Sequence, residues 1–289
     1  MSTQLSSLSP YIRLTRLDKP IGWLLLLWPT LWALWFAADG LPSIKNLVIF
    51  VSGVILMRSA GCAINDFADR NLDDKVTRTQ SRPLASGEIT PGMALVVFGA
   101  LTTLAFALVL LTNPLTITLS LGAVLLAACY PFAKRYTHLP QVVLGAAFSW
   151  GIPMAFAAET NTLPKPCWAL FMTGVLWTIA YDTFYAMVDR EDDLKAGIKS
   201  TAILFGDMDL TVIGGLQLLT VIGLLMVGRE FGMGLIYFSG VLIAGLLFLR
   251  QQQLARNRQP EGCFKAFKNN NWVGIWVFVA IVADHIITT

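Results

Sequence analysis

The sequence predicts an all-α integral membrane protein, a bundle of about nine transmembrane helices around a central cavity. Of its 289 residues, 55% are hydrophobic and only 13% are charged, whereas soluble domains carry roughly 25% charged residues. The charges are clustered, which leaves apolar stretches near the roughly 20 residues that a helix needs to cross a bilayer. These stretches are continuous rather than alternating, so helices fit the pattern and a β-barrel does not.

Charged and turn-forming residues divide the chain into its expected spans. The third and fourth spans are joined by the short turn Thr112-Asn113-Pro114, and the seventh and eighth meet at residues 228–232. No soluble domain interrupts them, so residues 1–289 are expected to form one membrane-embedded domain. The expected helices are 21–38, 44–66, 91–111, 115–131, 141–158, 167–188, 209–228, 234–250 and 272–288.

The distribution of Lys and Arg predicts the orientation. If the helices alternate, seventeen of the twenty-one Lys and Arg residues fall on one side of the membrane. Only Lys45, Lys165 and Arg229 fall on the other side, and Arg58 lies within a span. By the positive-inside rule, the N-terminus is expected in the cytoplasm and the C-terminus on the opposite side of the membrane. The basic loops flank the membrane, and no nucleic-acid partner is expected.

The first acidic motif, Asn65-Asp66-Phe67-Ala68-Asp69-Arg70-Asn71-Leu72-Asp73, ends the second span. If the helix continues, Asn65, Asp69 and Asp73 recur every four residues and share one face. Stacked oxygen-bearing side chains repel one another unless a cation lies among them. Hard oxygen ligands suit Mg²⁺, which shares its coordination shell with water and substrate phosphates.

The second acidic motif, residues 189–193, ends the sixth span and repeats this pattern. Asp189 and Asp193 are four residues apart, and Asp182 lies seven residues earlier on nearly the same face. Both motifs are followed by basic residues and are expected at the cytoplasmic face. A solvated loop would explain either motif alone, but two such motifs at one face favour a site for a metal and an anion. An ion site in a cation-coupled transporter is the alternative.

Arg58 lies seven residues before Asn65, about two turns deeper in the span. Its guanidinium could form an internal ion pair, or it could bind an anionic substrate through its planar fork of donors. We retain the second interpretation as a hypothesis, with Arg58 as the contact for a carboxylate.

Several stretches resemble a known family. Besides the two acidic motifs, these are Asp18-Lys19-Pro20-Ile21-Gly22, residues 81–84, residues 130–141, residues 181–201 and Phe267-Lys268-Asn269-Asn270-Asn271. Together they span nearly the whole chain. The sequence resembles the UbiA superfamily of intramembrane prenyltransferases, and most closely its bacterial branch that acts on 4-hydroxybenzoate in ubiquinone synthesis.

This resemblance implies Mg²⁺ as cofactor, with Asn65, Asp69, Asp73, Asp189 and Asp193 as ligands. It implies Arg135 and Lys199 as diphosphate contacts, with Arg135 supporting catalysis, and Asp189 or Asp182 as the group that helps deprotonate the phenol. The implied substrates are a polyprenyl diphosphate and 4-hydroxybenzoate, and the implied location is the inner membrane of a bacterium. A related prenyltransferase with another aromatic acceptor is the alternative within the superfamily.

Overall fold

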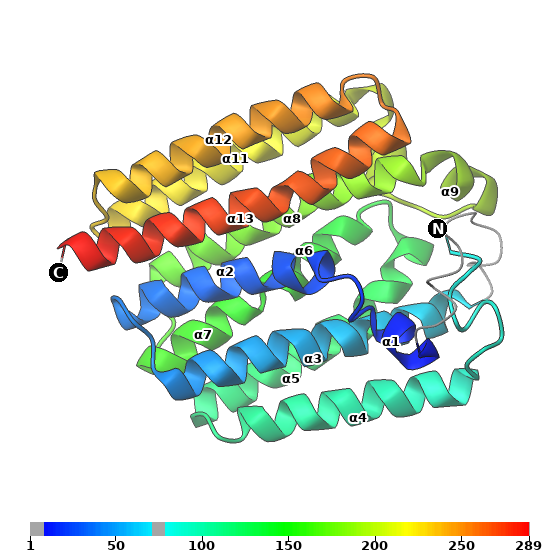
Figure 1. Cartoon of the computed structure of the whole chain (residues 1–289), viewed down its shortest axis with the longest axis horizontal. Helices are drawn as coiled ribbons and strands as arrows, with labels where there is room; N and C mark the ends of the chain where they lie inside the picture. Colours follow the sequence, from blue (N-terminus) through cyan, green and yellow to red (C-terminus); the bar gives the residue numbers. More distant parts are fainter. Residues whose placement is uncertain (1–8, 71–78, 289) are drawn as a thin grey trace.

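The computed structural model describes residues 9–70 and 79–288, which are helical with no strand among them. The long helices lie side by side in one bundle (Figure 1). In chain order the elements are α1 (Pro10–Thr15), α2 (Ile21–Ala38), α3 (Ile44–Asp69), α4 (Pro91–Val109), α5 (Pro114–Tyr136), α6 (Pro140–Ser149), α7 (Gly151–Thr160), α8 (Lys165–Val188), α9 (Arg190–Ala196), α10 (Thr201–Phe205), η3 (Gly206–Met208), α11 (Asp209–Glu230), α12 (Leu235–Ala255) and α13 (Pro260–Thr288).

Eight spans within the described residues are long and apolar enough to cross a membrane. They are α2, α3, α4, α5, the α6–α7 pair, the segment from α10 to α11, α12 and α13. Helix α8 is also long, with 24 residues, but it carries Asp182 and three threonines and is less apolar. It packs within the bundle against α6, α11 and α13. The predicted all-α membrane bundle of about nine spans is therefore confirmed.

Local sequence signals fix where several helices begin. The side chains of Ser43, Thr90 and Asn113 each accept a hydrogen bond from the backbone N–H three residues on, and so cap α3, α4 and α5. Proline occupies the first helical position of α4 and α5, where its missing N–H costs nothing. The short turn expected at 112–114 therefore lies where the sequence placed it.

Several predicted boundaries are wrong. Helix α3 continues to Asp69, α5 to Tyr136 and α12 to Ala255, and α13 begins at Pro260, twelve residues before the expected start. The expected span 141–158 is two helices, α6 and α7, with Trp150 between them. Pro153 cannot donate to the carbonyl four residues before it, at Ser149, and this accounts for the break.

Three consecutive asparagines of α13 hold the bundle together. Asn271 accepts a hydrogen bond from the indole of Trp28 on α2 at 2.9 Å, and Asn270 accepts one from Trp177 on α8 at 2.8 Å. Asn269 accepts one from Gln251 on α12 at 3.1 Å. Buried polar groups must be paired, so these bonds fix the relative positions of four helices.

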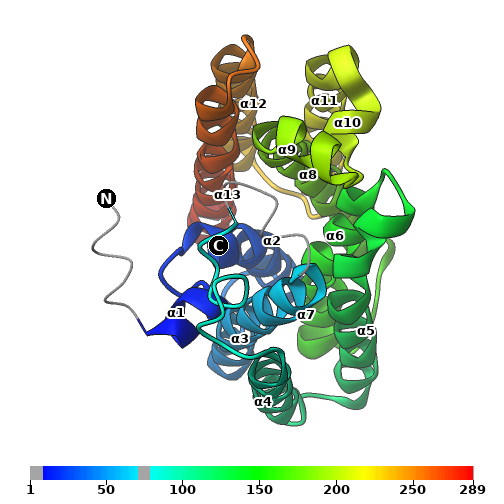
Figure 2. The same cartoon turned by 90° about the vertical axis from the view of Figure 1, so that its right-hand side faces the viewer.

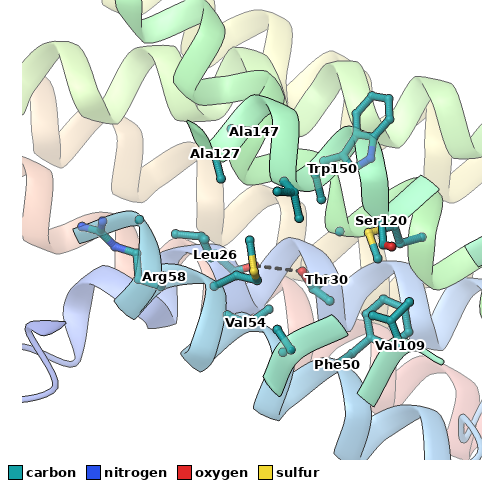
Figure 3. Close-up of a pocket in the computed structure, with 18 of the residues that line it drawn as sticks. Leu26, Thr30, Phe50, Val54, Arg58, Val109, Ser120, Ala127, Ala147 and Trp150 are labelled. Atoms are coloured by element: carbon teal, nitrogen blue, oxygen red, sulfur yellow. Dashed lines mark hydrogen bonds between the residues drawn. The ribbon is translucent and has the colours of Figure 1, made fainter. Parts of the chain in front are cut away.

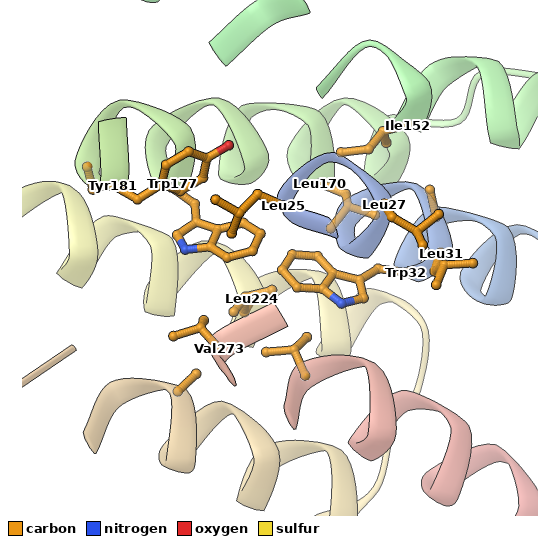
Figure 4. Packing of buried hydrophobic residues seen from close by; sticks show 14 of the residues in the cluster. Leu25, Leu27, Leu31, Trp32, Ile152, Leu170, Trp177, Tyr181, Leu224 and Val273 are labelled. Carbon is orange, nitrogen blue, oxygen red and sulfur yellow. The ribbon is translucent and has the colours of Figure 1, made fainter. Parts of the chain in front are cut away.

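Aromatic packing completes this core. The rings of Trp32 on α2 and Trp177 on α8 are stacked with centroids 5.1 Å apart, and Tyr181 meets Trp177 edge-on at 5.4 Å (Figure 4). Tyr181 also lines the cavity described below. The rigid core and the wall of the site therefore share the same turn of α8.

Because the spans alternate in direction, both acidic motifs emerge at one end of the bundle. The C-terminal ends of α3 and α8 lie at the end that is opposite the C-terminus of the chain (Figure 1). Figure 2 looks onto this end and shows α1, α9 and α10 close to the viewer.

Candidate active site

A cavity of about 880 Å³ opens at this end of the bundle, and we call it the polar cavity. Its walls come from α2, α3, α5, α6, α8, α9 and α13 and from the segments before α2, between α3 and α4 and after α9. It brings together seven residues singled out from the sequence: Arg58, Asn65, Asp69, Asp182, Asp189, Asp193 and Lys199. Arg135 is not among the lining residues, and Asp73 lies outside the described residues.

The first motif occupies the last turns of α3. Asn65 and Asp69 share a face as expected, and the Asn65 amide donates a hydrogen bond to Oδ2 of Asp69 at 3.1 Å. The same oxygen forms an ion pair with Lys134 of α5. Oδ1 of Asp69 is buried without a hydrogen-bond partner among the described residues. The motif therefore presents an acceptor oxygen that a cation or a donor could use.

The second motif lies at a break between two helices, and the helix before it ends where the predicted span 167–188 ends. Helix α8 ends at Val188, and Asp189 adopts φ −98° and ψ 3° before α9 begins. The Asp193 N–H still donates to the Asp189 carbonyl at 2.8 Å. The four-residue spacing therefore survives the break, and both carboxylates line the polar cavity. Asp182, two turns earlier on α8, lines it as well.

Cationic side chains line the same cavity as these carboxylates. The side-chain ammonium of Lys199 donates a hydrogen bond to the Tyr136 carbonyl at 3.4 Å, and the backbone N–H of Lys199 donates one to the Lys134 carbonyl at 3.3 Å. These two bonds connect the segment after α9 to the end of α5. Such an excess of positive charge suits an anionic ligand. The cationic residues that line the cavity are Arg13, Arg16, Lys19, Arg58, Arg82, Lys134 and Lys199.

Lys134 takes the position that the sequence suggested for Arg135. Arg135 donates to the Ala68 carbonyl, and its guanidinium lies over the Phe132 ring with its carbon 5.4 Å from the centroid. It therefore connects α5 to α3 outside the polar cavity. Adjacent residues on a helix point in different directions, so one of the pair faces the cavity and the other does not. Tyr130 lines the cavity, and Lys134 lies four residues later on the same face of α5. This spacing is the sequence signal that identifies Lys134 as the inward-facing residue.

Arg58 stands where the polar cavity meets a second, apolar one. Its guanidinium carbon lies 5.6 Å from the centroid of the Phe148 ring, and its Nε has no hydrogen-bond partner among the described residues. A Cβ at Gly22 would lie 3.2 Å from both Nε and Nη2, so the glycine leaves room for this arginine. Arg58 is therefore held against α2 with donor capacity left for a ligand.

The apolar cavity has a volume of about 140 Å³ and lies between α2, α3, α4, α5, α6 and α7 (Figure 3). Leu26, Phe50, Val54, Val109 and Trp150 are among its lining residues. It shares Arg58, Tyr130 and Phe148 with the polar cavity. A charged region and a hydrocarbon-like region thus adjoin at Arg58.

The donor set fits a magnesium ion bound together with a substrate. No group of three or more His, Cys, Asp or Glu residues close enough to hold a metal occurs within residues 9–70 and 79–288. The oxygens of Asn65 and Asp69 on one side and of Asp189 and Asp193 on the other instead give a few ligands each. Mg²⁺ is commonly bound in this way, with water and phosphate oxygens completing its shell.

Comparison with known proteins decides the family. The model of the UbiA prenyltransferase family matches residues 26–279. The chain belongs to the UbiA prenyltransferase family. This assignment decides against the transporter alternative, and it makes the chain a multi-pass membrane protein.

Two UbiA relatives illustrate the similarity in sequence. The 4-hydroxybenzoate octaprenyltransferase of Saccharophagus degradans is 61% identical over 283 residues, which cover 98% of this chain and 95% of that protein. The protein of the same name from Aeromonas hydrophila is 59% identical over 276 residues, which cover 96% of each.

Solved structures of UbiA homologues share the fold. The apo structure of a homologue from Aeropyrum pernix K1 matches with a TM-score of 0.80 at 22% identity, over 90% of this chain and 97% of that one. A homologue from Archaeoglobus fulgidus bound to DMAPP and Mg²⁺ matches with a TM-score of 0.71 at 21% identity, over 95% and 99%. Another structure of the A. fulgidus homologue contains Cd²⁺.

Proposed function

We propose that this protein transfers a polyprenyl group from a polyprenyl diphosphate to the ring carbon of 4-hydroxybenzoate that is ortho to its hydroxyl. The reaction releases diphosphate and belongs to ubiquinone synthesis. The observation that carries the proposal is the similarity over nearly the whole chain to proteins named 4-hydroxybenzoate octaprenyltransferase. The polar cavity supports it, because two acidic motifs and several cations meet where a metal–diphosphate pair would fit.

Mg²⁺ is the proposed cofactor. Asn65 and Asp69 from the first motif and Asp189 and Asp193 from the second would hold it, together with Asp73, which lies outside the described residues. When bound, Mg²⁺ would neutralise the charge that develops on the departing diphosphate. The binding of Mg²⁺ and DMAPP by the A. fulgidus homologue supports this choice of metal.

The side chains of the protein assist each step of the transfer. Lys134 and Lys199, which line the cavity, would stabilise the oxygen that keeps the electron pair of the breaking carbon–oxygen bond. The ring carbon then forms the new carbon–carbon bond with the allylic carbon, and the ring proton passes to a base. Asp189 or Asp182 would help to deprotonate the phenol, because both carboxylates line the same cavity. The role of Arg135 in this proposal is indirect, through its contact with α3.

The apolar cavity would receive carbons of the isoprenoid. It adjoins the polar cavity at Tyr130 and Phe148, so a chain whose diphosphate lies near Asp69 can leave past these rings. Exclusion of water matters here, because water would capture the allylic cation before the ring does. The carboxylate of the acceptor would lie at Arg58, between the two regions.

A reconstitution assay tests the function. The purified protein in lipid vesicles is expected to convert labelled 4-hydroxybenzoate and octaprenyl diphosphate into a prenylated product when Mg²⁺ is present. A parallel reaction with 1,4-dihydroxy-2-naphthoate in place of 4-hydroxybenzoate should give little product. Chromatography of the labelled lipids measures both. Product with the naphthoate alone would assign the chain to another acceptor and contradict the proposal.

We further propose that the protein lies in the bacterial inner membrane with its N-terminus and both acidic motifs in the cytoplasm and its C-terminus in the periplasm. The asymmetry of Lys and Arg supports this orientation. Reporter fusions after Arg82, Arg135 and Lys199 are expected to report the cytoplasm, and those after Asp39, Asn161 and Thr289 the periplasm. Fusions after Arg82 and Lys199 that reported opposite sides would exclude a single site at one face.

A further inference from the structure

Asp66 has surroundings unlike those of the other acidic residues in the first motif. Its side chain is 1% exposed and is not part of the lining of the polar cavity. Its Oδ1 accepts a hydrogen bond from Nη2 of Arg16 at 2.7 Å and lies 3.2 Å from Nη1 of Arg82. Asp66 therefore lies behind the wall of the cavity, where Arg16 and Arg82 both contact its carboxylate.

Both arginines reach Asp66 from segments outside the long helices. Arg16 follows α1 in the left-handed conformation, with φ 53°, and Arg82 lies in the segment between α3 and α4. Both line the polar cavity. Burial lowers the pKa of Arg16, but Asp66 raises it and the net shift is upward, so Arg16 stays charged. The two guanidiniums thus meet at Asp66, each within 3.2 Å of the same oxygen.

This arrangement holds two cationic side chains in the lining of the cavity. Arg16 contacts Asp66 through Nη2, and a guanidinium offers five N–H donors in all. Long arginine side chains lose much rotamer freedom when they bind a ligand, and an anchor that holds them in advance reduces that loss.

We propose that Asp66 is a positioning residue, which orients Arg16 and Arg82 as two diphosphate-binding side chains of the polar cavity. Asp66 itself binds neither metal nor substrate. The inference rests on the proposed function in one respect, namely that the ligand of the cavity carries a diphosphate.

The test measures the binding of inorganic diphosphate with Mg²⁺ by titration calorimetry, without turnover. Asp66→Asn is expected to raise the Kd about 10-fold, by analogy with the lower end of the roughly 10- to 100-fold losses that follow removal of a group that orients a metal ligand. The KM for polyprenyl diphosphate should rise in parallel, whereas the KM for 4-hydroxybenzoate should stay within about 2-fold, since Asp66 contacts neither cavity directly.

The chain offers a matched control in Asp209. This aspartate is also buried between two arginines, Arg190 and Arg258, but neither of them lines the polar cavity. Asp209→Asn is expected to lower thermal stability as Asp66→Asn does, yet to leave the Kd for diphosphate within about 2-fold, because it acts away from the ligand. If both variants raised the Kd for diphosphate equally, the effect of Asp66→Asn would be explained by a general loss of stability, and the proposal would be overturned.

A double-mutant cycle identifies the route of the effect. In a background of Arg16→Gln and Arg82→Gln, Asp66→Asn should add less than about 2-fold, because the side chains it positions are gone. Full additivity would overturn the proposal. Asp66→Glu, which keeps the charge but displaces the carboxylate, replaces Asp66→Asn in the cycle if the latter fails to accumulate. Wild-type protein that binds diphosphate but makes no prenylated product would contradict the proposed function and leave this inference standing.

Discussion

Asp69→Asn is expected to lower kcat/KM for the polyprenyl diphosphate at least ~10²-fold, the scale for losing one preorganised electrostatic group in an active site. The substitution keeps the size of the side chain and removes its charge. Asp69 is buried at the end of α3, pairs with Lys134 and presents Oδ1 without a partner among the described residues. Both the proposed metal and the lysine that faces the diphosphate depend on it.

Removal of the metal should have the larger effect. EDTA is expected to abolish prenyl transfer and added Mg²⁺ to restore it, because the acidic side chains repel a diphosphate unless a cation lies between them. Initial rates of product formation in lipid vesicles measure both effects. Near-normal turnover in EDTA would contradict the mechanism as a whole.

Asp192→Ala provides the matched control for Asp69→Asn. Asp192 belongs to the second acidic cluster, but its side chain is 30% exposed, its Oδ1 lies 4.0 Å from Lys195 on the same helix, and it does not line the polar cavity. Its removal should change kcat/KM less than about 2-fold, since its carboxylate does not line the polar cavity and a 4.0 Å ion pair within one helix contributes little. A large loss in this variant would mean that the net acidic charge matters rather than the position of each carboxylate.

The helical bundle was predictable because bilayer thickness leaves a strong signal in the sequence. The bounds of α2, 21–38, agree with the structure, since Pro20 precedes the helix and Asp39-Gly40 follows it with positive φ at both residues. The other ends are harder to predict, because a charged residue commonly marks the end of a transmembrane helix. Lys134 at the end of α5 and Asn270 in α13 instead lie within helices, where a polar cavity and an indole N–H replace the solvent as partners.

The site was predictable in its residue types more than in its geometry. The spacing of Asn65 and Asp69 determined their common face, because α3 continues through them. Spacing could not reveal that Asp66 turns away from the cavity toward two arginines, since those arginines come from segments far apart in the sequence. The choice between Lys134 and Arg135 likewise depends on how α5 is rotated against α3, which tertiary packing decides.

Arg58→Lys is expected to raise the KM for 4-hydroxybenzoate about 10-fold or more, within the range for losing a hydrogen bond to a charged group, with little change in the KM for the polyprenyl diphosphate. Arg58 lies about two turns deeper than Asn65, roughly 10 Å at 1.5 Å per residue. A benzoate is shorter than that, so its ring can lie between Arg58 and the acidic side chains with its carboxylate toward the guanidinium. Lysine keeps the charge but loses the planar pair of donors that matches a carboxylate.

A substrate without the charge separates recognition of the carboxylate from a general disturbance of the site. The uncharged analogue 4-hydroxybenzamide should bind the wild type and Arg58→Lys with similar KM values, because the interaction removed by the substitution is already absent. Steady-state kinetics with each substrate varied in turn measures this, with the amount of folded protein determined alongside. If Arg58→Lys instead raised the KM for the polyprenyl diphosphate alone, Arg58 would belong to the diphosphate site. Arg16, which lines the same cavity, would then be the next side chain to examine for the carboxylate.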